Sequence, residues 1–171
     1  YFRNEQDFKL FSNSFYDNLF SKEPYARQSD VFYQKGVLSD ELMGGVAREI
    51  PTGVGSGGWG WSQLRKINTM LGNMDKCDDQ AVVKQYTGLA KFFRARFYYD
   101  KVKRFGDVPW YDRELGSKDE DLYKTQDSRE FVMSKMLEDI DDAIESLPSA
   151  VSTYRVNRWA ALMLKAQFCL Y

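Results

Sequence analysis

The chain has 171 residues, with 24 basic and 25 acidic side chains, a formal net charge of −1 and no histidine. Without histidine, this stretch cannot supply the base of a Ser-His-Asp or Cys-His catalytic system, or a His ligand for zinc or haem. The balanced charge argues against nucleic acid as a partner, because nucleic-acid-binding surfaces are usually basic. Apolar residues make up 43% of the chain, as in ordinary globular domains, and no run approaches the roughly 20 apolar residues that span a bilayer.

The first 60 residues divide into one predicted helix and a glycine-rich segment. After Asn4, apolar side chains recur every three or four positions, at Phe8, Phe11, Phe15 and Leu19. This spacing predicts a helix with a buried aromatic face, which Asn4 caps and Pro24 ends. From about 24 to 60 the periodicity fades and glycines gather, so we expect an inserted loop there.

Two further helices are predicted between Trp61 and Pro109. Apolar residues at helical spacing continue from Trp61 through Leu64, Ile67, Leu71 and Met74. A longer helical pattern runs from about Gln80 to Phe105. Gly106 ends this helix, and Pro109 prevents it from resuming.

The last two predicted helices form a pair. Asp127 and Glu130 have the spacing of a capping box, with Asp127 in the cap position. The helix that follows ends at Pro148, and its apolar face comprises Met133, Met136, Ile140, Ile144 and Leu147. The final helix begins near Asn157 and carries Ala161, Leu164, Phe168 and Tyr171. Joined across residues 148–156, the two helices are expected to run antiparallel.

The pattern as a whole predicts an all-α fold. No segment alternates apolar and polar residues with a period of two, as a half-buried strand would. Antiparallel helix pairs that stack on one another form solenoids of the tetratricopeptide type. The literal tetratricopeptide consensus is absent, so periodicity alone leaves a generic helix bundle open.

A glycine-rich motif precedes the pair Trp59 and Trp61. Residues 53–58 read GVGSGG and contain a literal G-x-G-x-x-G. A dinucleotide-binding motif requires a strand before it and a helix that opens on its last glycine. The preceding residues, 43–51, do not read as a buried strand, so a connecting loop is the better interpretation.

The candidate ligand-binding residues are Trp59, Trp61, Arg48 and Asp40. Two tryptophans in a glycine-rich loop are costly to expose if the loop only connects two helices. Aromatic rings beside polar groups suit sugars, because the C–H faces of a sugar stack on the ring while its hydroxyls find donors and acceptors. Arg48 and Asp40 lie upstream on the same segment and would supply polar partners. The alternative is that Trp61 simply begins its helix and packs inward.

The acidic clusters and the cysteines predict no catalytic, metal or cofactor site. Carboxylates gather at 78–79, 119–121 and 138–142, but in polar runs or on the outer face of a helix. A solvated surface is therefore favoured over a glycosidase acid pair, which needs one carboxyl group in an apolar pocket. Cys77 and Cys169 lack metal-ligand spacing; two buried thiols are favoured, and a disulfide stays open.

Four blocks of the sequence resemble the SusD/RagB-like family of starch-utilisation-system proteins. The first is LRKINTMLGNMDK at 64–76, and the most specific runs from 88 to 109, with GLAKFFRA and then KRFGDVP. The third is EDIDDA with Leu147-Pro148, and the fourth is RVNR at 155–158 followed by paired alanines and LKA. Leu89 departs from the acid usual at its position, which we interpret as a lost contact on a helix face.

The resemblance implies a scaffold of antiparallel, tetratricopeptide-like helix pairs in a right-handed superhelix with inserted loops. Members of the family are surface-exposed lipoproteins of the outer membrane of Bacteroidetes, and they are considerably longer than 171 residues. We therefore expect residues 1–171 to be the N-terminal portion of one SusD-like domain, with the lipid anchor outside this stretch. Arg94 and residues 106–109 are expected to be structural, with Arg94 bonded to the backbone or to an acid inside the helical array.

The predicted function is capture of oligosaccharides without catalysis and their delivery to a SusC-like TonB-dependent transporter, on which family members sit. Affinity would come from ring stacking and a few hydrogen bonds. The alternatives are a helical-repeat scaffold that only docks proteins, a binder of peptide nutrients, and a fragment of a glycoside hydrolase whose carboxylates lie outside this stretch.

Overall fold

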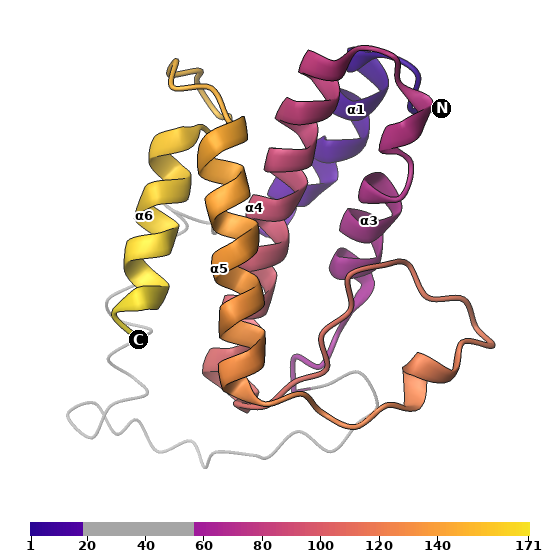
Figure 1. Cartoon of the computed structure of the whole chain (residues 1–171), viewed down its shortest axis with the longest axis vertical. Helices are drawn as coiled ribbons and strands as arrows, with labels where there is room; N and C mark the ends of the chain where they lie inside the picture. The colour runs from indigo at the N-terminus through magenta and orange to yellow at the C-terminus, as the bar shows by residue number, and fades with distance from the viewer. Residues whose placement is uncertain (19–56) are drawn as a thin grey trace, which may run out of the picture. The chain divides into compact units, whose positions relative to one another are not determined.

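The computed structural model describes residues 1–18 and 57–171, which are mainly helical (Figure 1). The α-helices and 3-10 helices (η) are, in chain order, α1 (Glu5–Ser12), η1 (Asn13–Asn18), α3 (Ser62–Leu71), η3 (Met74–Lys76), α4 (Gln80–Phe105), η4 (Glu120–Tyr123), α5 (Arg129–Ser146) and α6 (Arg158–Cys169). The described ranges contain no strand beyond an isolated antiparallel bridge between Val108 and Asp127. The predicted all-α, tetratricopeptide-like fold class is confirmed.

The chain divides into two units, one made of residues 1–15 and 61–171 and the other of residues 16–60. The larger unit holds the five α-helices of the described residues. Among the described helices, none combines the length and the apolar character needed to cross a lipid bilayer.

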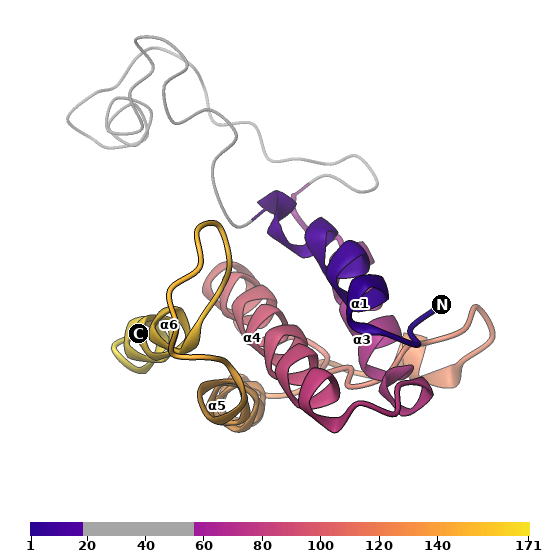
Figure 2. The same cartoon turned by 90° about the horizontal axis from the view of Figure 1, so that it is seen from above.

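The long helix α4 is the centre of the larger unit. It contacts α1 and α3 on one side and α5 on the other, while α6 packs mainly on α5 (Figure 2). Consecutive helices from α4 to α6 run antiparallel (Figure 1). Helix α4 buries residues around most of its circumference, and rings from α1 and η1 pack on it: Phe8 stacks on Tyr86 at 5.6 Å between centroids, and Phe15 meets Phe93 edge-on at 5.5 Å.

The beginnings and ends of the helices largely agree with the sequence signals. The side chain of Asn4 accepts a hydrogen bond from the Asp7 backbone N–H, and Asn157 accepts from Ala160. Gly106 ends α4 with a left-handed φ of 75°, which glycine adopts at little cost, and its N–H donates to the Val102 carbonyl. Helix α4 runs from Gln80 to Phe105, as predicted.

The predicted cap of α5 is wrong by one residue. Ser128 is the cap, and its hydroxyl accepts a hydrogen bond from the Phe131 N–H. The Asp127 carboxylate instead accepts the N–H of Trp110 and pairs with Lys124. Because these partners lie across the long connection between α4 and α5, Asp127 fixes that connection and not the helix.

The predicted buried face of α5 is only partly correct. Met136, Ile140 and Leu147 are buried, whereas Met133 and Ile144 are half-buried at the margin. The rest of the buried face is formed by Val132, Asp139 and Ala143. The prediction of two buried thiols is half correct as well: both cysteines are free, Cys77 is buried and Cys169 is exposed.

Candidate functional site

Trp61 lies at the edge of an aromatic cluster at the beginning of α3. It occupies the N-cap position and is half-buried. Its ring centroid lies 5.5 Å from that of Phe97, 6.2 Å from Tyr98 and 5.6 Å from Tyr111. Helix α4 supplies the first two rings and the connection after α4 supplies Tyr111. Trp61 therefore packs partly inward, as the alternative reading of the sequence expected, while part of its surface stays open to solvent.

Lys101 adds a positive charge to this aromatic cluster. Its Nζ atom lies 5.4 Å from the centroid of Trp61, 5.0 Å from Phe97 and 5.8 Å from Phe105. Ammonium groups at these distances are attracted to the electron-rich faces of aromatic rings. Burial lowers the pKa of Lys101, and the neighbouring Arg104 lowers it further. The cluster thus surrounds a buried cation with aromatic rings, of which Trp61 and Tyr111 keep part of their surface open to solvent.

The other three predicted binding residues are not placed beside Trp61 by the structure. Trp59 is 39% exposed and belongs to the smaller unit. Arg48 and Asp40 lie outside the described residues, as does most of the glycine-rich loop predicted at 24–60. The role of all four residues in binding stays a prediction.

The connection between α4 and α5, residues 106–128, is long for a link between antiparallel helices. Such links usually have two to eight residues, and structureless connections beyond about 12–15 residues are commonly functional. It extends to the side from one end of the α4–α5 pair, with η4 on the half that returns to α5 (Figure 1). Because Tyr111 on this connection touches Trp61, its position bears directly on the candidate site.

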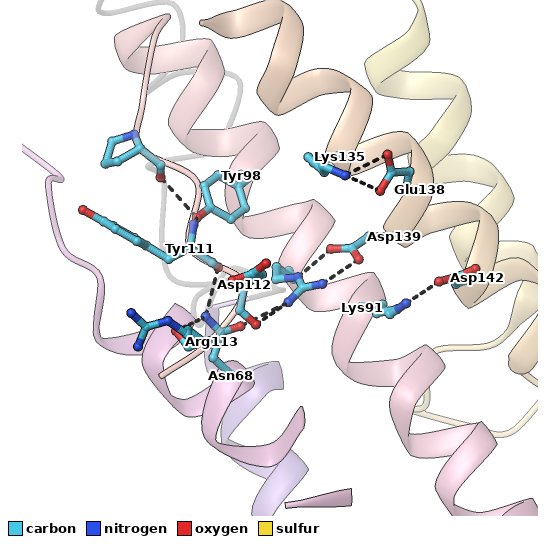
Figure 3. A network of polar contacts seen from close by, with 12 residues as sticks. Asn68, Lys91, Tyr98, Tyr111, Asp112, Arg113, Lys135, Glu138, Asp139 and Asp142 are labelled. Carbon is cyan, nitrogen blue, oxygen red and sulfur yellow. Dashed lines mark hydrogen bonds and ion pairs between the residues drawn. The ribbon is translucent and has the colours of Figure 1, made fainter. Parts of the chain in front are cut away.

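Tyr98 and Asn68 fix the first half of this connection (Figure 3). The Tyr98 hydroxyl accepts the Tyr111 N–H at 2.6 Å and donates to the Pro109 carbonyl at 3.2 Å. The side-chain amide of Asn68 donates to the carbonyls of Tyr111 and Arg113, at 3.0 Å each. Burial raises the pKa of Tyr98 well above its ordinary value, so the hydroxyl keeps its proton. Side chains of α3 and α4 thus satisfy backbone N–H and C=O groups of residues 109–113 that would otherwise need water.

Arg94 joins the same network to α5. Its guanidinium makes two parallel hydrogen bonds with the Asp139 carboxylate, at 2.6 and 2.7 Å, and both side chains are buried (Figure 3). It also donates to the Asp112 carbonyl at 3.2 Å and lies 5.2 Å from the Trp110 ring centroid. The expected bond of Arg94 to the backbone and to a buried acid is confirmed.

Asp139 corrects the prediction that the acids at 138–142 form only a solvated face. It points inward, and burial raises the pKa of its carboxyl group, while the bonds from Arg94 oppose that rise. The neighbouring acids behave as predicted: Glu138, Asp141 and Asp142 are exposed and pair with lysines. Neighbouring residues of a helix point in different directions, so Asp139 faces inward while these three acids face solvent.

Asp127 and Lys124 fix the second half of the connection. The Asp127 carboxylate accepts the Trp110 N–H at 2.7 Å and the Lys124 ammonium at 2.7 Å. Burial acts to raise the pKa of Asp127, but the bonds from Lys124 and the Trp110 N–H outweigh it and lower the pKa. Lys124 also donates to the Trp110 carbonyl and lies 5.2 Å from the Tyr111 ring centroid.

The candidate site combines a polar network with an aromatic cluster. Its polar groups hold the backbone of residues 106–128, and its aromatic rings gather around Trp61 and Tyr111. Among residues 1–18 and 57–171, no group of three histidine, cysteine, aspartate or glutamate side chains is placed to hold a metal ion. Sequence reasoning missed Asn68, Tyr98 and Tyr111; the first two lie in the helical blocks that carried the family resemblance, which was the available signal.

Comparison with known proteins agrees with this architecture. The sequence profile of a family described as SusD-like, starch-binding and associating with the outer membrane matches residues 4–157. A SusD-like protein from Formosa agariphila is 31% identical over 87 residues, which are 51% of this chain and 17% of the relative.

Two solved structures share the fold. A SusD-like protein from Bacteroides fragilis matches with a TM-score of 0.60 and 28% identity over 65% of this chain and 22% of its own. A laminarin-binding SusD-like protein matches with a TM-score of 0.60 and 22% identity over 65% of this chain and 25% of its own. The matched part thus makes up between 17% and 25% of the length of these relatives.

Proposed function

This chain belongs to the SusD-like family, and from that premise we propose that it is the N-terminal portion of a non-catalytic, glycan-binding protein of the outer membrane. The observation that carries the proposal is the family match over residues 4–157. The protein would be a lipoprotein exposed on the cell surface, anchored through a lipid outside residues 1–171. It would pass bound oligosaccharides to a SusC-like TonB-dependent transporter.

We propose that the ligand-binding residues of the chain are Trp61, Trp59, Arg48 and Asp40. The half-buried ring of Trp61, with the Lys101 ammonium 5.4 Å from its centroid, would stack on the C–H face of a sugar. The side chains of Arg48 and Asp40 would form hydrogen bonds with the sugar hydroxyls. The fixed position of Tyr111 favours binding, because a site that is ordered in advance loses less conformational entropy when the ligand arrives.

A carbohydrate ligand is further supported by the character of the relatives, since one solved relative is described as laminarin-binding. Binding by stacking and hydrogen bonds needs no acid or base, which fits a chain without histidine. The proposed role is therefore capture and transfer of an unmodified glycan.

Affinity electrophoresis in gels containing soluble starch or laminarin tests this proposal. We expect retardation of the protein by at least one glycan and weaker retardation of the Trp61→Ala and Trp59→Ala variants, by roughly 1–3 kcal/mol of binding free energy for each lost ring, by analogy with other aromatic stacking contacts. Tyr154→Ala is the matched control, because it removes an exposed ring from the connection between α5 and α6. Unchanged mobility of all variants in every glycan would contradict the proposed site, and release of new reducing ends would contradict the absence of catalysis.

A further inference from the structure

Helix α6 is apolar on two opposite faces. One face is buried against the other helices and comprises Ala161, Leu164 and Phe168. The other is exposed and comprises Trp159, Leu162, Met163, Ala166 and Cys169; together with Leu170, directly after the helix, we call it the outer face of α6. These positions recur at intervals of three and four residues, so they form one continuous stripe along the helix.

The exposure of this stripe is large. Met163 is 63% exposed, Trp159 58% and Leu170 90%. The polar residues Arg158, Lys165 and Gln167 border the stripe and do not interrupt it, and Lys165 pairs with Asp141 of α5. A helix with apolar residues on two opposite faces has a second surface that is normally packed against a neighbour in the complete protein.

Helix α5 provides the contrast within the same fold. Apart from Phe131, its exposed positions are polar, and they comprise Arg129, Glu130, Ser134, Glu138, Asp141, Asp142 and Glu145. Helix α5 therefore has one apolar face, which suits a helix with solvent on its other side. The second apolar face of α6 is a property of that helix alone in the pair.

In stacked helical arrays, a helix at the end of the stack needs a polar outer face to remain in solution. Helix α6 lacks one, so it has the character of an internal helix. The family relatives supply the length for further helices, because the part matched here is only 17–25% of their chains. We propose that the outer face of α6 is the docking site for a helix from the part of the SusD-like domain outside residues 1–171.

The chemistry of the stripe defines the helix that fits it. The docking helix would carry apolar residues at i, i+3, i+4 and i+7, facing Leu162, Met163 and Ala166. The small side chain of Ala166 at the middle of the stripe allows a close approach of the two backbones. This inference rests on the proposal that residues 1–171 form part of a longer domain, but it does not depend on which ligand the domain binds.

Methionine oxidation tests the proposal directly. The 171-residue chain and the full-length protein would be treated with hydrogen peroxide, and oxidation of each methionine followed by mass spectrometry. Met70 and Met136 are fully buried and serve as internal references. We expect Met163 to oxidise at least about tenfold faster than both references in the 171-residue chain, and at about their rate in the full-length protein.

Other occupants give different results. Fast oxidation of Met163 in both proteins would overturn the proposal. Slow oxidation in the 171-residue chain, together with a dimer in analytical ultracentrifugation, would assign the face to a second copy; slow oxidation in the monomer would mean that residues 1–171 already cover it. None of these outcomes depends on glycan binding, so failure here is distinct from failure of the proposed function.

A substitution separates docking from folding of α6 itself. Met163→Glu should leave the melting temperature of the 171-residue chain unchanged but lower that of the full-length protein by several degrees. Leu10→Glu is the matched control, because Leu10 is a 54% exposed apolar residue on α1. Equal effects of Met163→Glu in both proteins would count against a docked helix.

Discussion

Gly88 of α4 lies so close to Ser146 at the end of α5 that a Cβ atom at position 88 would come within 2.6 Å of the Ser146 Cβ. The two helix backbones approach each other here without a side chain between them. The glycine opens the family-like block GLAKFFRA, and the structure gives the position a physical reason: glycine alone fits this contact.

Gly88→Ala is therefore expected to destabilise the fold. The added methyl group must push α4 and α5 apart, and overpacking of this kind costs about 1–3 kcal/mol of unfolding free energy. Urea denaturation measures the loss. Gly116→Ala is the control, because a Cβ there meets no atom within 4 Å and the backbone angle is ordinary. Equal stability of the two variants would mean that the helices move apart at no cost.

Arg94→Leu should be one of the most damaging single changes in the larger unit. It leaves the Asp139 carboxylate buried without its cation, and breaking a buried pair in this way typically costs about 3–5 kcal/mol. The double variant Arg94→Leu/Asp139→Leu should regain much of the loss, because neither charge remains. Urea midpoints test both. Lys135→Ala, which breaks an exposed pair with Glu138, should cost less than about 1 kcal/mol; no recovery in the double variant would contradict this account.

Tyr98→Phe should loosen the connection between α4 and α5 while leaving the helices formed. The change removes one donor to the Pro109 carbonyl and one acceptor for the Tyr111 N–H, with an expected cost of about 1–3 kcal/mol. Hydrogen exchange should quicken at the Tyr111 amide and remain slow in the middle of α4. Tyr123→Phe, at an exposed tyrosine of η4, serves as the control. If Tyr111 exchanges at the same rate in Tyr98→Phe as in the parent protein, the hydroxyl does not hold the connection.

The ion pair of Asp127 predicts an acid-sensitive contribution to stability. Because the folded protein lowers the pKa of Asp127, the contribution is fully present above the unfolded value near 3.9 and is lost as the pH falls through the folded value. Asp127→Asn should destabilise the protein at pH 7 and reduce the fall in stability between about pH 5 and pH 2. Urea unfolding across this range measures the slope. Parallel curves for the parent and the variant would exclude Asp127 as a source of the acid sensitivity.

The helices could be predicted because their signals are local. Asn4, Asn157, Gly106 and Pro148 act within a turn of the residues they cap or end, and the apolar spacing is legible along each helix. The predicted capping box at Asp127 was wrong because the partner of Asp127 is not local in the sequence. Its carboxylate accepts a hydrogen bond from the Trp110 N–H, and Trp110, 17 positions away, becomes a neighbour only when α4 and α5 pack.

The site was harder to predict for the same physical reason. Asp139 reads as one acid in an acidic run, and only the packing of α5 on α4 brings it to Arg94, 45 positions away. Trp61 was identified from composition, but its contacts with Phe97 and Tyr111 depend on the tertiary fold. For Arg48 and Asp40 the binding role stays a prediction.

The anchoring of residues 106–128 divides that connection into a fixed base and a variable tip. The side chains of Tyr98, Asn68 and Arg94 hold its backbone as far as Arg113. Asp127 holds the end that leads into α5, through its bond from the Trp110 N–H. Glu114 still bonds Arg65 and Thr69 of α3, and Lys124 belongs to the fixed base through its pair with Asp127. Residues 115–123, including η4, are mostly exposed, and their printed ion pairs are with Arg113, so we expect changes confined to them to leave the helices undisturbed. A designer could therefore exchange the tip as a unit and leave the base intact.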